Sequence, residues 1–279
     1  MLPLAFVAVV CLAPFAHSYS LVTQKSPFPA SSTNQRFGSS RASLPPLRLK
    51  GGGEHEEIPK KIKLTYFNIE GAAEKIRLAF KIGNVPFEDE RIDFGVWQSE
   101  LKGKSKFGQL PLLTLDDKPP VAQSFAILRY IGRLCGLYPD DPLKAMYVDE
   151  ACALQEDLAK ALAPSMYIGM RPHLFGYPEN LPDAEKKSIQ KRLRDALIAE
   201  GGDVRRYLGY FERYLKENGG EFLCGNSVTI ADCTLLPALR QFKSGRLEGI
   251  PTTIIDEYPL LAAYYNRIMS LPAVKAHYT

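Results

Sequence analysis

The strand-forming pattern in this chain ends before Pro142, and this boundary constrains the fold more than any other feature of the sequence. Ahead of it, short runs that alternate apolar and polar residues indicate strands, and helical patterns separate them. Beyond it, apolar residues recur at helical spacing in long stretches, at about 143–170, 185–217, 229–241 and 258–270. Since 279 residues exceed one typical domain, we expect two domains of different class.

The first part of the pattern predicts a small α/β domain over residues 59–138. Four short strands are expected, at 62–66, 87–92, 112–115 and around Val121. Two helices are expected, at 71–80 with Gly83 as its C-cap and at 124–135. The resulting order, βαβ followed by ββα, is the layout of a thioredoxin-like domain.

A proline-rich linker then separates this domain from the rest of the chain. Pro139 and Pro142 stand close together, and each interrupts regular structure. The remaining residues, 143–279, predict an all-helical C-terminal domain. The expected fold class is therefore α/β plus all-α.

The N-terminal residues have the composition of targeting segments. Residues 2–16 form an apolar run too short to span a bilayer, and a small-x-small site follows, so residues 1–18 are expected to be a signal peptide. Residues 19–58 are rich in Ser, Pro and Arg and are expected to form a disordered, transit-like leader. This arrangement resembles the bipartite presequence of algae with secondary plastids. The alternative is a secreted or endomembrane protein with a disordered arm.

Charge and cysteine spacing argue against several classes of function. Residues 1–53 hold five basic residues and no Asp or Glu, which accounts for the net charge of +4, so no basic face for nucleic acid is expected in the folded part. We expect no stable membrane insertion either. Four cysteines lack the spacing of a zinc site or a disulfide framework, so buried thiols and no metal are expected: Cys135, Cys152, Cys224 and Cys233.

Several separated segments resemble, in order and spacing, the soluble glutathione S-transferases, and in particular their sigma class. They are Tyr66–Glu74 (YFNIEGAAE), Trp97, Phe107–Pro111 (FGQLP), Gln123–Ile131 (QSFAILRYI) and Gly225–Asp232 (GNSVTIAD). The resemblance runs from Lys61 to the C-terminus. It implies an enzyme that uses glutathione as co-substrate and joins it to a small-molecule electrophile, and it implies a homodimer. It leaves open whether the same enzyme also reduces hydroperoxides.

Tyr66 lies where the first strand runs into the first helix, and the resemblance implies that it is catalytic. Its hydroxyl would donate a hydrogen bond to the sulfur of glutathione. The thiolate is the nucleophile, and a free thiol with a pKa near 8.5 is mostly protonated at neutral pH. A hydrogen bond to the charged form favours that form. Taken alone, without the other segments, a tyrosine at this position is better explained as a core residue of a strand.

The resemblance also assigns the residues that would hold glutathione. Pro111 would be a cis-proline, so that the backbone N–H and C=O of Leu110 face the cysteinyl part of the peptide like a short strand. Ser124, at a helix start, would hold the γ-glutamyl carboxylate, and its other reading is a simple N-cap. The implied glutathione-binding set is Tyr66, Trp97, Lys102, Gln109, Leu110, Pro111, Gln123, Ser124 and Asp157.

Two members of this set, Lys102 and Asp157, have an alternative. Trp97 and Lys102 would reach the glycyl end of glutathione, but an apparent one-residue insertion leaves Lys104 and Lys106 as alternatives to the lysine. Asp157 would reach across a dimer to the glutathione amine, or it is only a solvated helix charge.

The electrophile is expected to bind between the two domains. Candidate residues for its pocket are Met166, Tyr167, Met170 and His173, although side chains of this type at helical spacing also form cores. Thr229 and Asp232 have the spacing of a capping box, which is a structural role.

The chain departs from the sigma pattern in its first loop. Glu70 and Ala72 stand where basic residues are common, which weakens the expectation that a nearby cation assists Tyr66. It also weakens the expectation of a narrow glutathione-dependent isomerase activity. The alternative functions are that isomerase or a non-catalytic ligand-binding protein of the same fold. A cysteine-dependent thiol transferase is disfavoured because no cysteine occupies the first loop.

Overall fold

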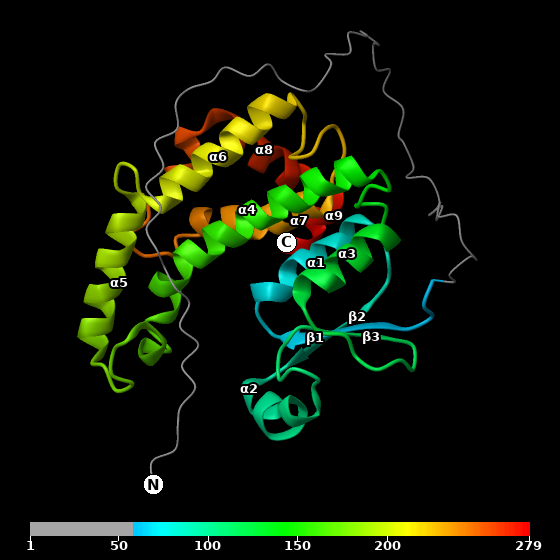
Figure 1. The fold of residues 1–279 in the computed structure, drawn as a ribbon, viewed down its shortest axis with the longest axis horizontal. Coiled ribbons are helices and arrows are strands. Elements are labelled where there is room, and N and C mark those ends of the chain that lie inside the picture. Colours follow the sequence, from blue (N-terminus) through cyan, green and yellow to red (C-terminus); the bar gives the residue numbers. More distant parts are fainter. Residues whose placement is uncertain (1–57) are drawn as a thin grey trace. The chain divides into compact units, whose positions relative to one another are not determined.

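The computed structural model describes residues 58–279 of the chain. The expected signal peptide and almost all of the expected leader therefore lie outside the described residues. Within residues 58–279 the structure has a thioredoxin-like domain followed by a helical domain, as the sequence predicted (Figure 1). No helix in this part of the chain is long and apolar enough to cross a membrane.

A small sheet forms the first domain. Its strands are β1 (Ile62–Phe67), β2 (Glu88–Ile92) and β3 (Leu112–Leu115). The order is β2-β1-β3, with β1 parallel to β2 and antiparallel to β3. The expected fourth strand is only an isolated bridge between Leu113 and Val121. Two prolines precede Val121, and because proline has no N–H they prevent the pairing from extending.

Helices make up most of the remaining structure. In chain order they are α1 (Glu74–Ile82), α2 (Phe94–Val96), α3 (Ser124–Leu134), α4 (Pro142–Tyr167), α5 (Asp183–Ile198), α6 (Asp203–Asn218), α7 (Ile230–Lys243), α8 (Pro259–Ser270) and α9 (Pro272–Tyr278). Gly83 follows α1 as its C-cap, as predicted. A 3₁₀ turn, Gly71–Ala73, leads into α1, and α2 continues through a π-type turn, Trp97–Leu101, into a 3₁₀ turn, Lys102–Lys104.

The prediction of one helical stretch over 185–217 was wrong, because α5 and α6 are separate helices. Gly201 lies between them with a φ of +76°, a conformation that L side chains rarely adopt. At Gly202, a Cβ atom would lie 2.4 Å from the carbonyl oxygen of Ala196. The two glycines therefore end one helix and let the chain pass close to it before the next begins. The short helix α9 was not predicted.

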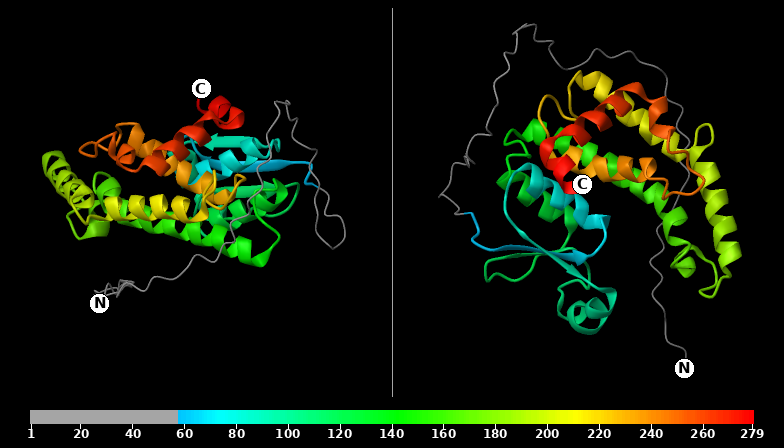
Figure 2. Two further views of the ribbon diagram at one scale, coloured as in Figure 1. Left: turned by 90° about the horizontal axis from the view of Figure 1, so that it is seen from above. Right: turned by 180° about the vertical axis from the view of Figure 1, so that it is seen from behind.

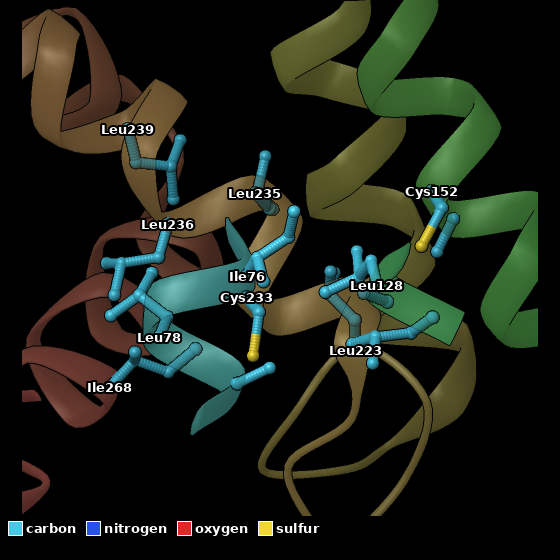
Figure 3. Packing of buried hydrophobic residues seen from close by; sticks show 14 of the residues in the cluster. Ile76, Leu78, Leu128, Cys152, Leu223, Cys233, Leu235, Leu236, Leu239 and Ile268 are labelled. Atoms are coloured by element: carbon cyan, nitrogen blue, oxygen red, sulfur yellow. The ribbon is translucent and has the colours of Figure 1, made fainter. Parts of the chain in front are cut away.

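The two domains share one hydrophobic core. Figure 3 shows Ile76 and Leu78 of α1 near Cys233, Leu235 and Leu236 of α7, and none of these side chains is more than 1% exposed. The C-terminal helix α9 also lies beside α1 (Figure 2). The helix that follows Tyr66 in the chain is thus anchored to the helical domain on two sides.

Candidate active site

Tyr66 is held at the end of β1 by the turn that follows it. Its side chain is largely buried, with 9% exposure, and its hydroxyl oxygen accepts a hydrogen bond from the backbone N of Ala72 at 3.1 Å. The chain reaches this position by turning at Gly71, whose φ is +46°. Because a hydroxyl can accept and donate at once, the phenolic proton of Tyr66 stays available for a ligand. The Ala72 N–H lies at the start of a helix, where the backbone dipole is positive.

A buried arginine, which sequence reasoning did not single out, holds this loop in shape. Arg77 is fully buried and donates to the carbonyl oxygen of Ile69 at 2.7 Å, and also to those of Glu70 and of Phe67, the last residue of β1. Its charge is balanced by Glu74 at 3.2 Å and Asp89 at 3.0 Å. The guanidinium carbon lies 5.8 Å from the centroid of the Tyr66 ring. The sequence signal that could have found it is its place between Ile76 and Leu78, two apolar residues of the predicted helix.

The acidic residue of the loop is paired with cations from the helical domain. Glu70 Oε1 lies 3.4 Å from Nη2 of Arg240, on α7, and 3.7 Å from Nη1 of Arg246. The first loop lacks the basic residues of the sigma pattern, yet Arg77, Arg240 and Arg246 surround it. Cations are therefore present around this loop, although neither position 70 nor position 72 carries one.

The peptide bond between Leu110 and Pro111 is cis. Within residues 58–279, neither the backbone N–H nor the backbone C=O of Leu110 makes a hydrogen bond. A donor and an acceptor on one residue are therefore available to an extended peptide at this edge. The neighbouring Gln109 accepts a hydrogen bond from Nε2 of Gln123 at 2.9 Å, which brings these two predicted ligand-binding segments together.

Gln123 and Ser124 form the start of α3. Gln123 has φ +78° and ψ 100°, an uncommon backbone conformation for a residue with a side chain, and such outliers cluster at functional sites. Its carbonyl oxygen accepts the first helical hydrogen bond, from Ile127 N at 3.0 Å. The N–H groups of the first turn lack partners within the helix and, with the half-buried Ser124, can bind a carboxylate.

Trp97 and Lys102 lie on the segment between β2 and β3. Trp97 is 5% exposed, and its ring meets Phe67 edge-on with centroids 6.5 Å apart. The aliphatic stem of Lys102 passes over Gly108, whose Cβ position would lie 3.8 Å from Lys102 Cγ. Lys106, one of the two alternatives, lies instead over the Phe107 ring at 5.1 Å. The Lys102 side chain therefore lies beside Gly108, next to Gln109.

Other predicted residues do not join this group. Asp157 lies on α4 and pairs with Lys160 of the same helix at 3.2 Å, and no described contact links it to the residues around Tyr66. Met166 is half-buried, and its sulfur accepts a weak hydrogen bond from Gln241 of α7 at 3.8 Å. The remaining pocket candidates, Tyr167, Met170 and His173, are exposed at and beyond the end of α4.

The capping box at the start of α7 extends into a larger buried network. Asp232 Oδ2 accepts from the backbone N of Thr229 at 2.7 Å and from its hydroxyl at 3.1 Å. Asp232 Oδ1 accepts from Leu223 N at 3.0 Å and from the Tyr264 hydroxyl at 2.9 Å. Burial raises the pKa of Asp232 above its usual range, although these hydrogen bonds partly oppose that effect. The network joins three segments of the helical domain and does not contact Tyr66.

Comparison with known proteins agrees with this arrangement of fold and site. Residues 62–133 match the family model described as "Glutathione S-transferase, N-terminal domain", and residues 182–279 match "Glutathione S-transferase, C-terminal domain". Glutathione S-transferase 1 of Ascaris suum is 32% identical over 213 residues, which is 76% of this chain and 93% of the relative.

Solved structures give the same result. The glutathione S-transferase of Ascaris lumbricoides is 32% identical with a TM-score of 0.61, over 77% of this chain and 95% of that one. A Necator americanus enzyme described as monomeric is 28% identical with a TM-score of 0.61, over 77% and 95% of the two chains. Among residues 58–279, no group of three His, Cys, Asp or Glu side chains is placed to hold a metal ion. The chain belongs to the glutathione S-transferase family and is a transferase that uses glutathione.

Proposed function

We propose that Tyr66 activates the thiol of bound glutathione and that the resulting thiolate attacks a small electrophile. The thiol proton leaves to solvent, and the Tyr66 hydroxyl donates a hydrogen bond to the thiolate until the sulfur bonds to the electrophilic atom. The electron pair of the bond broken at that atom leaves with the leaving group or, in an addition, moves to the neighbouring atom, which takes a proton from solvent. The observation that carries this proposal is the contact between Tyr66 Oη and Ala72 N at 3.1 Å. An accepted hydrogen bond polarises the phenol and makes it a better donor.

The residues around Tyr66 fit the chemistry of glutathione. The cysteinyl backbone has a donor and an acceptor that match the unpaired N–H and C=O of Leu110. The γ-glutamyl carboxylate matches the N-terminus of α3 at Ser124. The glycyl carboxylate matches the ammonium of Lys102, with the indole N–H of Trp97 as a further donor. These assignments follow from complementary chemistry, and mutation of each residue can test them.

The electrophile would bind between the end of α4 and the loop that joins β1 to α1, residues 68–73, which we call the Tyr66 loop. Exposed apolar side chains stand on both sides of this region, with Ile69 57% exposed and Met170 71% exposed. An apolar electrophile is the class that such side chains favour, and organic hydroperoxides are a second class that the same thiolate could reduce.

Assay of the full chain with glutathione and a panel of electrophiles and hydroperoxides tests this function. We expect conjugation with at least one apolar electrophile, and a large loss in Tyr66→Phe. Tyr210→Phe is a matched control, since Tyr210 lies on α6 away from the loop. Binding of glutathione without turnover of any compound would favour a non-catalytic ligand-binding protein, and turnover confined to isomerisation would favour the isomerase alternative.

We also propose that residues 1–53 belong to a targeting leader that is removed, for a plastid of secondary origin or, alternatively, for secretion or the endomembrane lumen. The support is the composition of this segment. N-terminal sequencing of native protein tests it, and a start at Met1 would contradict it.

A further inference from the structure

The C-terminal helix contacts the start of α1 through a buried hydrogen bond between two side chains. His277 Nε2 lies 2.7 Å from Glu74 Oε1, and the two side chains are 10% and 3% exposed. A carboxylate can only accept a hydrogen bond, so the proton lies on Nε2 of the imidazole. The two residues are 203 positions apart in the chain. This contact therefore ties the end of the described chain to the turn that follows Tyr66.

Glu74 is well placed to transmit this contact to the Tyr66 loop. Its backbone N–H donates to the carbonyl oxygen of Gly71, which closes the turn that presents the Ala72 N–H. Its second carboxylate oxygen lies 3.2 Å from Nη1 of Arg77, the guanidinium that binds the loop carbonyls. Burial alone would raise the pKa of Glu74, but His277 and Arg77 together lower it below its usual value. The carboxylate is therefore charged and held by two partners.

A second route leads from α9 to the same loop. The guanidinium carbon of Arg240 lies 3.4 Å from the centroid of the Tyr278 ring, which fixes the guanidinium by a cation–π contact. The same guanidinium reaches Glu70, on the other side of the turn, at 3.4 Å. Consecutive residues of α9 thus reach both flanks of the segment that contains Gly71 and Ala72, His277 by direct contact with Glu74 and Tyr278 through Arg240.

We propose that His277 is a positioning residue for Tyr66: through Glu74 it fixes the turn that presents the Ala72 N–H to the phenolic oxygen. This inference rests on the proposed role of Tyr66 in activating the thiol. Without the His277 proton, one oxygen of a buried carboxylate loses its partner, and Glu74 and Arg77 rearrange to satisfy it. The turn then holds Ala72 less firmly, and the Tyr66 hydroxyl donates less strongly to the thiolate.

The test compares three variants of the full chain. His277→Phe removes the donor and keeps a ring, His277→Gln keeps a donor near the position of Nε2, and Lys275→Ala is a control at an exposed residue of the same helix. The readouts are the thiol pKa of bound glutathione by ultraviolet titration, the Kd of glutathione, and amide exchange of the peptide that spans residues 67–78.

For His277→Phe we expect the thiol pKa to rise by about half a unit, so that conjugation at pH 6.5 falls about threefold. Amide exchange around Ala72 should quicken, while the glutathione Kd stays within about twofold because the groups that hold the peptide are unchanged. His277→Gln should restore most of the thiol pKa, and Lys275→Ala should match the wild type. If His277→Phe instead unfolded the chain, the glutathione Kd would rise together with the thiol pKa and the exchange rate. That outcome would contradict the positioning role, which leaves the Kd unchanged.

Combination with Tyr66→Phe separates this inference from the proposed function. If His277 acts through Tyr66, the double variant should have the same thiol pKa as Tyr66→Phe alone. Independent, additive shifts would overturn the inference, as would an unchanged thiol pKa and unchanged exchange in His277→Phe while Tyr66→Phe shows its effect. An unchanged thiol pKa in Tyr66→Phe itself would overturn the proposed function.

Discussion

The Tyr66 hydroxyl occupies the space into which any side chain on Gly71 would project. A Cβ atom at Gly71 would lie 2.6 Å from Tyr66 Oη and 2.9 Å from a carbon of its ring. The φ of +46° at Gly71 is also unfavourable for an L side chain. The turn therefore needs glycine for two independent reasons, and one of them is the position of the proposed catalytic group.

This relationship predicts that Gly71→Ala displaces Tyr66. The left-handed conformation alone should reduce the free energy of unfolding by about 1–2 kcal/mol. The clash should move the hydroxyl, and kcat/KM for conjugation should fall about tenfold or more, as for loss of a hydrogen bond to a charged group. Gly95→Ala is the control, because nothing lies within 4 Å of its Cβ position. Wild-type kcat/KM in Gly71→Ala would contradict this account.

A second prediction concerns Lys75 of α1, whose side chain is half-buried and whose ammonium nitrogen lies 4.0 Å from the centroid of the Phe125 ring. Burial, only partly opposed by Glu156, lowers its pKa from 10.5 to about 8. Folding at pH 7 therefore buries a charge at a cost. Lys75→Met keeps most of the apolar stem, and it should raise the free energy of unfolding at pH 7 by about 1 kcal/mol, after loss of the cation–π contact.

The pH dependence of this effect has a definite sign. Between about pH 8 and pH 10.5, Lys75 is neutral in the folded chain but still protonated in the unfolded chain. The unfolded state then binds more protons, so the wild type gains stability as pH rises through this window. Urea unfolding at pH 7 and pH 9.5 should show the advantage of Lys75→Met shrinking. The exposed Lys81→Met is the control, and a constant advantage would exclude the burial explanation.

The network around Asp232 predicts a defect in folding without a defect in chemistry. Asp232→Asn has nearly the same shape, but its amide has a single acceptor atom, and the two carboxylate oxygens each accept from a backbone N–H. In either orientation, one N–H of the network faces an NH₂ group. We expect a loss of about 3 kcal/mol in the free energy of unfolding, measured by urea denaturation.

The conjugation activity of Asp232→Asn distinguishes a structural role of Asp232 from a catalytic one. The fraction of Asp232→Asn that is folded should conjugate at the wild-type rate, while Asp117→Asn, at an exposed turn, should change neither property. A folded Asp232→Asn protein with a much lower kcat would show that the network also serves the active site.

The match of Asp157 to the family's amine-binding carboxylate predicts a homodimer. The Asp157 side chain is half exposed and makes no described contact with the residues around Tyr66 in its own chain. If Asp157 binds the glutathione amine, it therefore does so in the active site of a second copy of the chain. The Necator americanus relative described as monomeric shows that the fold alone does not fix this state. Sedimentation at micromolar concentration should give a dimer.

Mutation of the same residue should weaken glutathione binding without dissociating that dimer. For Asp157→Asn we expect a Kd raised about threefold to tenfold, as for one partly exposed charged hydrogen bond. Asp195→Asn is the matched control, because Asp195 is also paired with a lysine of its own helix, Lys191, at 2.6 Å. A wild-type monomer with ordinary glutathione affinity would contradict the role of Asp157.

Local patterns predicted most of the fold because each element has its own signal. Alternation in Ile62, Leu64 and Tyr66 indicates β1, and the glycine after α1 indicates its end. The break at Gly201 was missed because the helical spacing of apolar residues continues on both sides of it. The glycine pair itself was the available signal.

The candidate site was only partly predictable. Gln109 and Pro111 were singled out because the segment Phe107–Pro111 resembles a motif of the family. The pairing of His277 with Glu74 joins residues 203 positions apart, and no local pattern encodes it. Arg240 and Glu70 likewise meet only because α7 packs beside the Tyr66 loop. Side chains that depend on such tertiary packing have no signal in a single sequence.

The central claim is that the Tyr66 hydroxyl stabilises the glutathione thiolate, and ultraviolet titration of thiolate in the binary complex tests it most directly. Tyr66→Phe removes the hydroxyl and keeps the ring, so folding should barely change. A hydrogen bond to a charged group is worth about 1.5–3 kcal/mol, so the thiol pKa should rise by about one to two units. Conjugation near neutral pH should fall about tenfold to a hundredfold and recover as pH rises. An unchanged titration midpoint in Tyr66→Phe would mean that Tyr66 is only a core residue and would contradict the account.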